Sequence, residues 1–104
     1  MVLYVLRWEI LPERQVEYNE WLKTAIPRQL RVPGLIELRA YRVAAGSGHV
    51  VGTYEFADLA AWAAWWSHEE VQKVIGESRN YTSKVTTELW GPSPLASTPF
   101  RPGQ

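Results

Sequence analysis

At 104 residues the chain has the length of one domain, and it can bury one hydrophobic core without disulfides, because it contains no cysteine. Its 11 basic and 11 acidic side chains balance, and the absence of a basic run argues against nucleic acid as a partner. No apolar run approaches the roughly 20 residues of a membrane span, and the lack of cysteine fits a cytoplasmic protein.

The first elements predicted are a strand and a helix. Residues 2–9 are rich in β-branched, aromatic and leucine side chains, which favour a strand. Leu11-Pro12-Glu13 then marks a helix start, since proline suits the first helical position. The apolar side chains that we expect on one face of this helix are Val16, Trp21, Leu22, Ala25 and Ile26.

Proline predicts where the first helix ends. Pro27 predicts a kink or a break, with residues 28–31 as a last short turn, and Pro33-Gly34 is a stop signal. A β-hairpin should follow, with strands over residues 35–44 and 49–56 and a glycine-containing turn over residues 45–48.

The second half predicts a bent helix, a strand and a tail. Asp58 can cap a helix, and Ser67 with Glu70 has the form of a capping box, which predicts a restart of that helix near Ser67. We expect this helix to end at residues 77–80 and a fourth strand to cover residues 81–90. The sequence therefore predicts a folded domain over residues 1–91 and a proline-rich tail over residues 92–104.

The order strand, helix, strand, strand, helix, strand is that of an α+β ferredoxin-like sandwich, a β-α-β-β-α-β fold with an antiparallel sheet. In this fold both helices cover one face of the sheet. The strands carry apolar side chains on both faces, for example Tyr4 and Leu6 on one and Leu3 and Val5 on the other. We therefore expect a homodimer formed by two such sheets face to face, with the first part of the tail packed along the partner.

Two segments connect this pattern to a known family. Residues 32–35 (Val-Pro-Gly-Leu) lie between the first helix and the second strand, and residues 54–56 (Tyr-Glu-Phe) lead into Trp62 and Trp66-Ser67. With the element order, they resemble the dimeric α+β barrel superfamily, and within it the antibiotic-biosynthesis-monooxygenase domains, over about residues 2–92. The resemblance implies a ligand pocket between the helices and the sheet of each subunit.

Aromatic residues are the main candidates for binding a ligand. Trp62 and Trp66 share a face of the second helix, and Trp8, Tyr54 and Trp90 could complete an aromatic wall from the sheet. This wall would suit a small, planar, hydrophobic ligand. The alternative is that these rings serve only core and interface packing.

His68 and Arg7 are the polar candidates for catalysis. His68 lies at a helix start, which favours a neutral imidazole and hence a general base, and Arg7 could orient a substrate. The alternatives are an exposed histidine of the first turn and a strand arginine in an ion pair. The spacing of histidines and acids predicts no metal site.

The resemblance implies a cofactor-independent monooxygenase that acts on a hydrophobic aromatic or polyketide-like small molecule. Haem-degrading relatives carry an asparagine on the first strand, an aromatic on the third strand and a haem-ligating histidine on the second helix. Arg7, Tyr54 and Ile75 occupy these positions here, which argues against haem degradation. The alternative function is a non-catalytic ligand-binding or interaction module on the same dimeric fold.

Overall fold

The computed structural model describes residues 1–45 and 49–103 and shows the predicted order of elements. The predicted turn over residues 45–48 falls almost wholly outside the described residues. The elements are β1 (Val2–Ile10), the 3-10 helix η1 (Pro12–Arg14), α1 (Gln15–Leu30), β2 (Glu37–Arg42), β3 (Val50–Phe56), α2 (Leu59–Trp66), α3 (Glu69–Ser78) and β4 (Thr82–Trp90).

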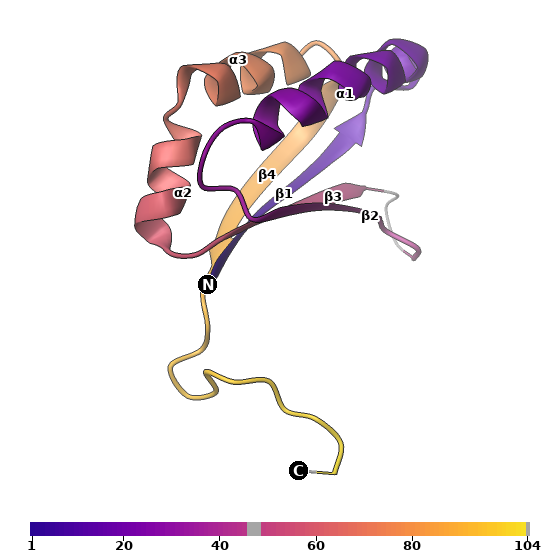
Figure 1. The fold of residues 1–104 in the computed structure, drawn as a ribbon. Coiled ribbons are helices and arrows are strands. Elements are labelled where there is room, and N and C mark those ends of the chain that lie inside the picture. Colours follow the sequence, from indigo (N-terminus) through magenta and orange to yellow (C-terminus); the bar gives the residue numbers. More distant parts are fainter. Residues whose placement is uncertain (46–48, 104) are drawn as a thin grey trace.

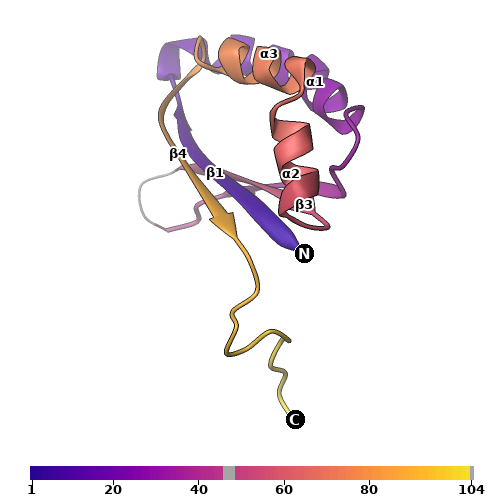
Figure 2. The ribbon, with the colours of Figure 1, turned by 90° about the vertical axis from the view of Figure 1, so that its left-hand side faces the viewer.

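The four strands form one antiparallel sheet in the order β2-β3-β1-β4. All helices lie over the same face of this sheet, and the other face is uncovered (Figures 1 and 2). This arrangement confirms the α+β ferredoxin-like prediction. Because side chains alternate along a strand, Tyr4 and Leu6 of β1 turn to the helices and are buried, whereas Leu3 and Arg7 turn to the helix-free face.

The core lies between the helices and the central strands β1 and β3. Trp65 of α2 is 1% exposed, and its ring packs against Tyr54 and Phe56 with ring centroids 5.3 and 5.2 Å away. Val71 and Val74 of α3 close the same layer. This contact explains the short, strongly apolar sequence of α2, which buries one large ring against two aromatic rings of β3.

Two expectations for the first helix were wrong, the break at Pro27 and the buried position of Val16, whereas the alternative of a kink at Pro27 stays a prediction. α1 continues through Pro27 to Leu30, and the backbone N–H of Arg31 donates to the carbonyl of Pro27 (3.2 Å). Pro27 and Lys23 are both exposed, so water can satisfy the carbonyl that loses its helical donor. Val16, expected on the buried face, is 71% exposed.

The second helix is divided as predicted, but a different residue caps its second half. Asp58 accepts a hydrogen bond from the Ala61 N–H (2.8 Å) and starts α2. The Ser67 hydroxyl donates to the Ala63 carbonyl (2.7 Å) at the end of α2, so the predicted capping-box role of Ser67 was wrong. His68 is the N-cap of α3 and accepts from the Glu70 N–H through Nδ1 (3.1 Å).

The chain after β4 leaves the body of the domain (Figure 1). Leu95 is 96% exposed and Phe100 is 84% exposed, so the single chain offers these side chains no cover. Within the described residues, no helix combines the length and the apolar character that crossing a membrane requires.

Candidate functional site

A cavity of about 330 Å³ lies between the sheet and the two longer helices. We call it the helix–sheet cavity. Its floor is formed by side chains and backbone of the sheet, among them Leu6, Trp8, Leu38, Ala40, Gly52 and Tyr54. Its roof is formed by side chains of α1 and α3, among them Tyr18, Trp21, Leu22, Ile26, Val74 and Ile75. The lining is thus predominantly apolar and aromatic, as in most small-molecule sites.

Gly52 makes room for the largest ring of the floor. A Cβ atom at this position would stand 3.0 Å from Cη2 of the Trp8 indole, a distance that a packed side chain rarely reaches. A glycine inside a strand often marks such a close approach. The indole also donates a hydrogen bond from Nε1 to the Tyr18 hydroxyl (3.0 Å), so β1 and α1 together hold the ring against the cavity.

Two tyrosines, Tyr18 and Tyr54, belong to the lining. Burial raises the pKa of Tyr54, and the nearby Tyr18 and Tyr4 raise it further. Burial likewise raises the pKa of Tyr18, although the hydrogen bond from Trp8 opposes the shift. Both hydroxyls therefore keep their protons throughout the neutral range and can donate hydrogen bonds there.

A glutamine at the end of α1 adds an amide to the wall. Gln29 lines the cavity and is only 5% exposed. Its Nε2 donates to the Ala25 carbonyl (3.1 Å), and its own backbone carbonyl accepts from Trp65 Nε1 (3.2 Å). The side-chain oxygen Oε1 is buried and has no hydrogen-bond partner among the described residues.

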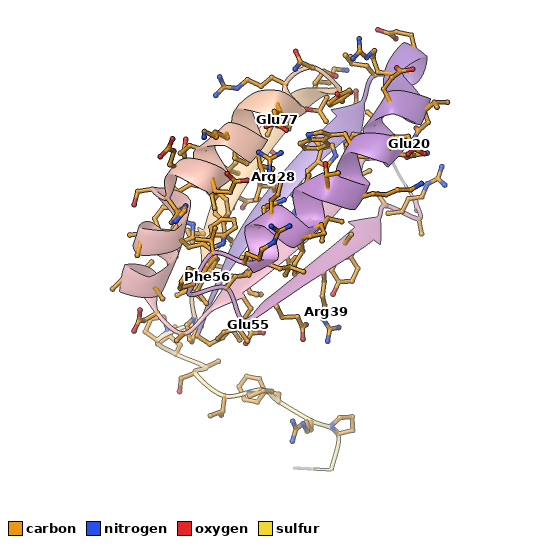
Figure 3. All side chains as sticks on the ribbon, turned by 45° about the horizontal axis from the view of Figure 1, so that its top comes forward. Glu20, Arg28, Arg39, Glu55, Phe56 and Glu77 are labelled. Atoms are coloured by element: carbon orange, nitrogen blue, oxygen red, sulfur yellow. The ribbon has the colours of Figure 1, made fainter. Side chains whose placement is uncertain are left out.

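A polar clamp joins α1 to α3 beside the cavity. Arg28 extends from α1 toward α3, where Glu77 lies (Figure 3), and donates to both carboxylate oxygens of Glu77 (2.7 and 2.8 Å). It also pairs with Glu70, and Trp21 Nε1 donates to Glu77 (2.8 Å). The hydrogen bonds from Arg28 and then Trp21 lower the pKa of Glu77 to about 2. The clamp fixes the distance between the two helices that form the roof.

Trp8 and Tyr54 are the two predicted ligand-binding residues that line the cavity. Trp62 and Trp66 instead stack on one another (6.3 Å between ring centroids) and pack against Tyr4. They cover the sheet beside the cavity and are not part of its lining.

The other predicted site residues lie elsewhere. Trp90 is on the helix-free face, next to Leu3 of β1. Arg7 lies on the same face and pairs with Glu88 (3.6 Å). His68 is exposed in the link between α2 and α3, outside the lining of the cavity. In the described part of the chain, no three histidine, aspartate or glutamate side chains gather where they could hold a metal ion.

Sequence reasoning missed the contribution of α1 to the cavity. Tyr18, Leu22, Ala25 and Gln29 follow one another at spacings of four, three and four residues, which is the spacing of one helix face. Tyr18 and Gln29 are polar, so a prediction based on apolar side chains alone left them out of the buried face and included the exposed Val16. The spacing of these residues along the helix indicated the buried face, whereas their hydrophobicity did not.

Three helices over one face of an antiparallel sheet, with an apolar cavity between the layers, define a ferredoxin-like α+β domain among the described residues. The family model for antibiotic biosynthesis monooxygenases matches residues 1–77. This match covers most of the chain, and the protein therefore belongs to the antibiotic biosynthesis monooxygenase family. Among curated proteins, none matches the sequence.

Solved structures share the fold. SnoaB, a cofactor-independent oxygenase from Streptomyces nogalater, superposes with a TM-score of 0.73 at 14% identity, covering 88% of this chain and 92% of that chain. Rv0793 from Mycobacterium tuberculosis superposes with a TM-score of 0.73 at 15% identity, covering 88% of this chain and 94% of that chain. A further structure, of an antibiotic biosynthesis monooxygenase, superposes with a TM-score of 0.74 at 17% identity, covering 90% of this chain and 100% of that chain. At these identities the likeness is one of fold.

Proposed function

We propose that this protein binds a small planar aromatic molecule in the helix–sheet cavity and catalyses its oxygenation by O₂. The observation that carries this proposal is the cavity itself, whose volume of about 330 Å³ and aromatic lining suit a ring system of modest size. Membership of the antibiotic biosynthesis monooxygenase family and the shared fold of SnoaB support the reaction class.

The proposed reaction takes its electrons from the substrate. In an anthrone-type molecule, the ring methylene loses two hydrogens and gains one oxygen atom of O₂ as a carbonyl, and the other oxygen leaves as water. Four electrons pass from substrate to O₂, so the equation balances without a further reductant. The reactive form is the enolate, which is made when the methylene gives up a proton.

The protein's part is to enclose the ring and to stabilise the enolate oxygen. The neutral hydroxyls of Tyr18 and Tyr54 can donate hydrogen bonds to that oxygen, and the apolar walls exclude water that would weaken those bonds. Among the described residues of the lining there is no histidine, carboxylic acid or lysine. The proton therefore passes to hydroxide or buffer, and the rate should rise with pH as the substrate ionises.

Oxygen uptake with anthrone tests the oxygenase proposal. The wild type should consume O₂ above the rate of buffer, and Tyr54→Phe should lower kcat at least about tenfold because it removes one donor to the enolate. Tyr41→Phe is the matched control, since Tyr41 is half exposed on the helix-free face. An uptake equal to that of buffer, or equal rates in the wild type and Tyr54→Phe, would count against the proposal.

A second candidate function is ligand binding without turnover. It is favoured by the absence of a side chain in the lining that titrates near neutral pH, because general acid–base catalysis normally needs one. Calorimetry with anthraquinone, which cannot be oxidised further in this way, separates the two. Binding of anthraquinone without uptake in the presence of anthrone would identify a binding module.

We also propose that two copies form a homodimer through the helix-free face. That face carries the half-exposed rings of Tyr41 and Trp90 beside Leu3 and Val51, which is more apolar surface than a solvated sheet normally presents. A two-fold axis would place the same patch of each copy against the other.

A further inference from the structure

The Trp21 indole of α1 is held by two neighbouring rings. Its ring centroid lies 5.3 Å from that of Tyr81, with the two planes 31° apart, and 6.0 Å from that of Tyr18. The guanidinium carbon of Arg14 lies 5.0 Å from the centre of the Tyr81 ring, a distance typical of a cation–π contact. Such contacts favour one orientation of a ring over others, so the Trp21 indole is ordered before any ligand binds.

A hydrogen bond at the edge of the ring fixes the same indole more firmly. Nε1 of Trp21 donates to a carboxylate oxygen of Glu77 (2.8 Å), and Arg28 donates to both oxygens of that carboxylate (2.7 and 2.8 Å). Hydrogen bonds to an ionised acceptor are stronger than neutral ones. Because α3 carries Glu77 and α1 carries both donors, the position of the indole depends on the contact between the two helices of the roof.

Trp21 keeps surface that a ligand in the cavity can reach. The residue is only partly buried, and it belongs to the lining of the helix–sheet cavity. It lies in the roof, whereas Trp8, the other indole of the lining, lies in the floor and is held against Gly52. Flat rings can stack on an indole, and a ring that is already fixed loses little conformational entropy when they do. Trp21 therefore has the position and the rigidity of a stacking platform.

We propose that Trp21 is the stacking platform on which the aromatic ring of the ligand binds, and that Glu77 is a positioning residue that holds the Trp21 indole for this contact. The inference rests on the proposed function in one respect, that the ligand occupies the helix–sheet cavity. It goes further by assigning the recognition of aromatic ligands to one ring and the orientation of that ring to one carboxylate. A saturated molecule of the same size lacks the stacking contact and binds more weakly.

Calorimetric titration with 1-naphthol and with its fully saturated counterpart 1-decalol tests the role of Trp21. The wild type should bind 1-naphthol more tightly than 1-decalol. Trp21→Leu keeps an apolar side chain and removes the ring, so it should lower the ratio of the two affinities at least about threefold. Trp90→Leu is the matched control, because Trp90 lies on the helix-free face, and this variant should keep the wild-type ratio.

Two variants of Glu77 test its positioning role. Both remove the charge that pairs with Arg28, but Glu77→Gln keeps an oxygen that can accept from Trp21 Nε1, whereas Glu77→Met has no such acceptor. Glu77→Gln should therefore keep the wild-type affinity ratio, and Glu77→Met should lower it at least about twofold. If Glu77 served only to join α1 and α3, both variants would change the two affinities in proportion and leave the ratio as it was.

Intermolecular NOEs keep the test decisive if Trp21→Leu does not fold. In the wild type, the ring protons of bound 1-naphthol should show NOEs to the indole protons of Trp21. No binding of 1-naphthol, a ratio that survives Trp21→Leu, the absence of these NOEs, or the same ratio in Glu77→Met and Glu77→Gln would overturn the inference. Stacking on Trp21 without oxygen uptake from anthrone would contradict the oxygenase proposal and leave the roles of Trp21 and Glu77 intact.

Discussion

His68 shows how the same residue can suit two roles that the sequence does not separate. As a predicted general base it would need to face the ligand, but the structure places it at the N-cap of α3, where Nδ1 accepts from the Glu70 N–H. An N-cap needs an acceptor at the helix start, and an unprotonated imidazole nitrogen provides one. Both roles require the neutral ring, so the expected charge state could not distinguish them.

His68→Ala should therefore change stability and leave ligand binding unchanged. Loss of the cap should lower the free energy of unfolding by about 0.5–1 kcal/mol, measured by urea denaturation. Calorimetry should give the same Kd for 1-naphthol as in the wild type, because His68 is outside the lining. A tenfold weaker Kd with unchanged stability would contradict this account and support a role for His68 in the site.

At the scale of elements, the clamp between α1 and α3 should make stability depend on acid pH. Glu77 has an ordinary pKa of 4.5, and in the fold its pKa is lowered to about 2. The folded state thus prefers the ionised form, so this contribution is complete above about pH 4.5 and is lost as the pH falls toward 2. We expect Glu77 to contribute about 1–2 kcal/mol to the free energy of unfolding, because its side chain is 39% exposed and solvent screens part of the interaction.

Urea denaturation between pH 5 and pH 2.5 checks this prediction. Glu77→Gln should be less stable than the wild type at pH 5, and the difference should shrink as the pH falls. Glu20→Gln is the control, since Glu20 is an exposed carboxylate of α1 paired with Lys23 at 3.0 Å. If Glu77→Gln and Glu20→Gln gave the same pH profile, the clamp would not contribute as described.

The elements could be predicted from the sequence more fully than the site. Three local signals each fix an element close to where the structure has it: the β-branched, aromatic and leucine side chains of residues 2–9, the Pro33-Gly34 stop and the Asp58 cap. The cavity depends on which side chains meet across layers. Trp8 was expected in the wall, but its partner Tyr18 and the space left by Gly52 involve three elements that no local pattern connects.

The tryptophans also show that sequence spacing alone does not predict which side chains line the cavity. A face shared by Trp62 and Trp66 was correctly inferred from their spacing, because ring centroids 6.3 Å apart follow from a four-residue separation on a helix. Whether that face lines a cavity or covers the sheet depends on the tilt of α2, which a single sequence does not contain. Trp90 and Trp8 likewise lie on opposite faces of the sheet, because Trp90 pairs with Leu3 and side chains alternate along β1. This pairing register cannot be read from the sequence of one strand.

At the scale of the whole molecule, the helix-free face should hold two chains together. Light scattering at micromolar concentration should give about twice the chain mass of 11.9 kDa. Trp90→Ser, which removes a half-exposed ring from that face, should shift the equilibrium toward the monomer, and Leu59→Ser on α2 is the control. A monomer in the wild type would contradict the dimer and leave the helix-free face without a cover.

The tail that follows β4 should contribute to the proposed dimer. We propose that residues 92–104 form an extension separate from the domain over residues 1–91 and pack in part on the partner, since Leu95 and Phe100 are uncovered in the single chain. Truncation after Pro92 should raise the dimer dissociation constant without changing the circular dichroism of the domain. Loss of secondary structure in the truncated chain would show that the tail belongs to the fold.

Ligands should bind between the helices and the sheet, and intermolecular NOEs locate them most directly. With 1-naphthol bound, the ring protons should show NOEs to methyl groups of Leu22, Val74 and Ile75, which line the helix–sheet cavity. NOEs confined to Val51 and Thr53, which line the shallow hollow of the helix-free face, would place the ligand on the opposite side of the sheet and contradict the account.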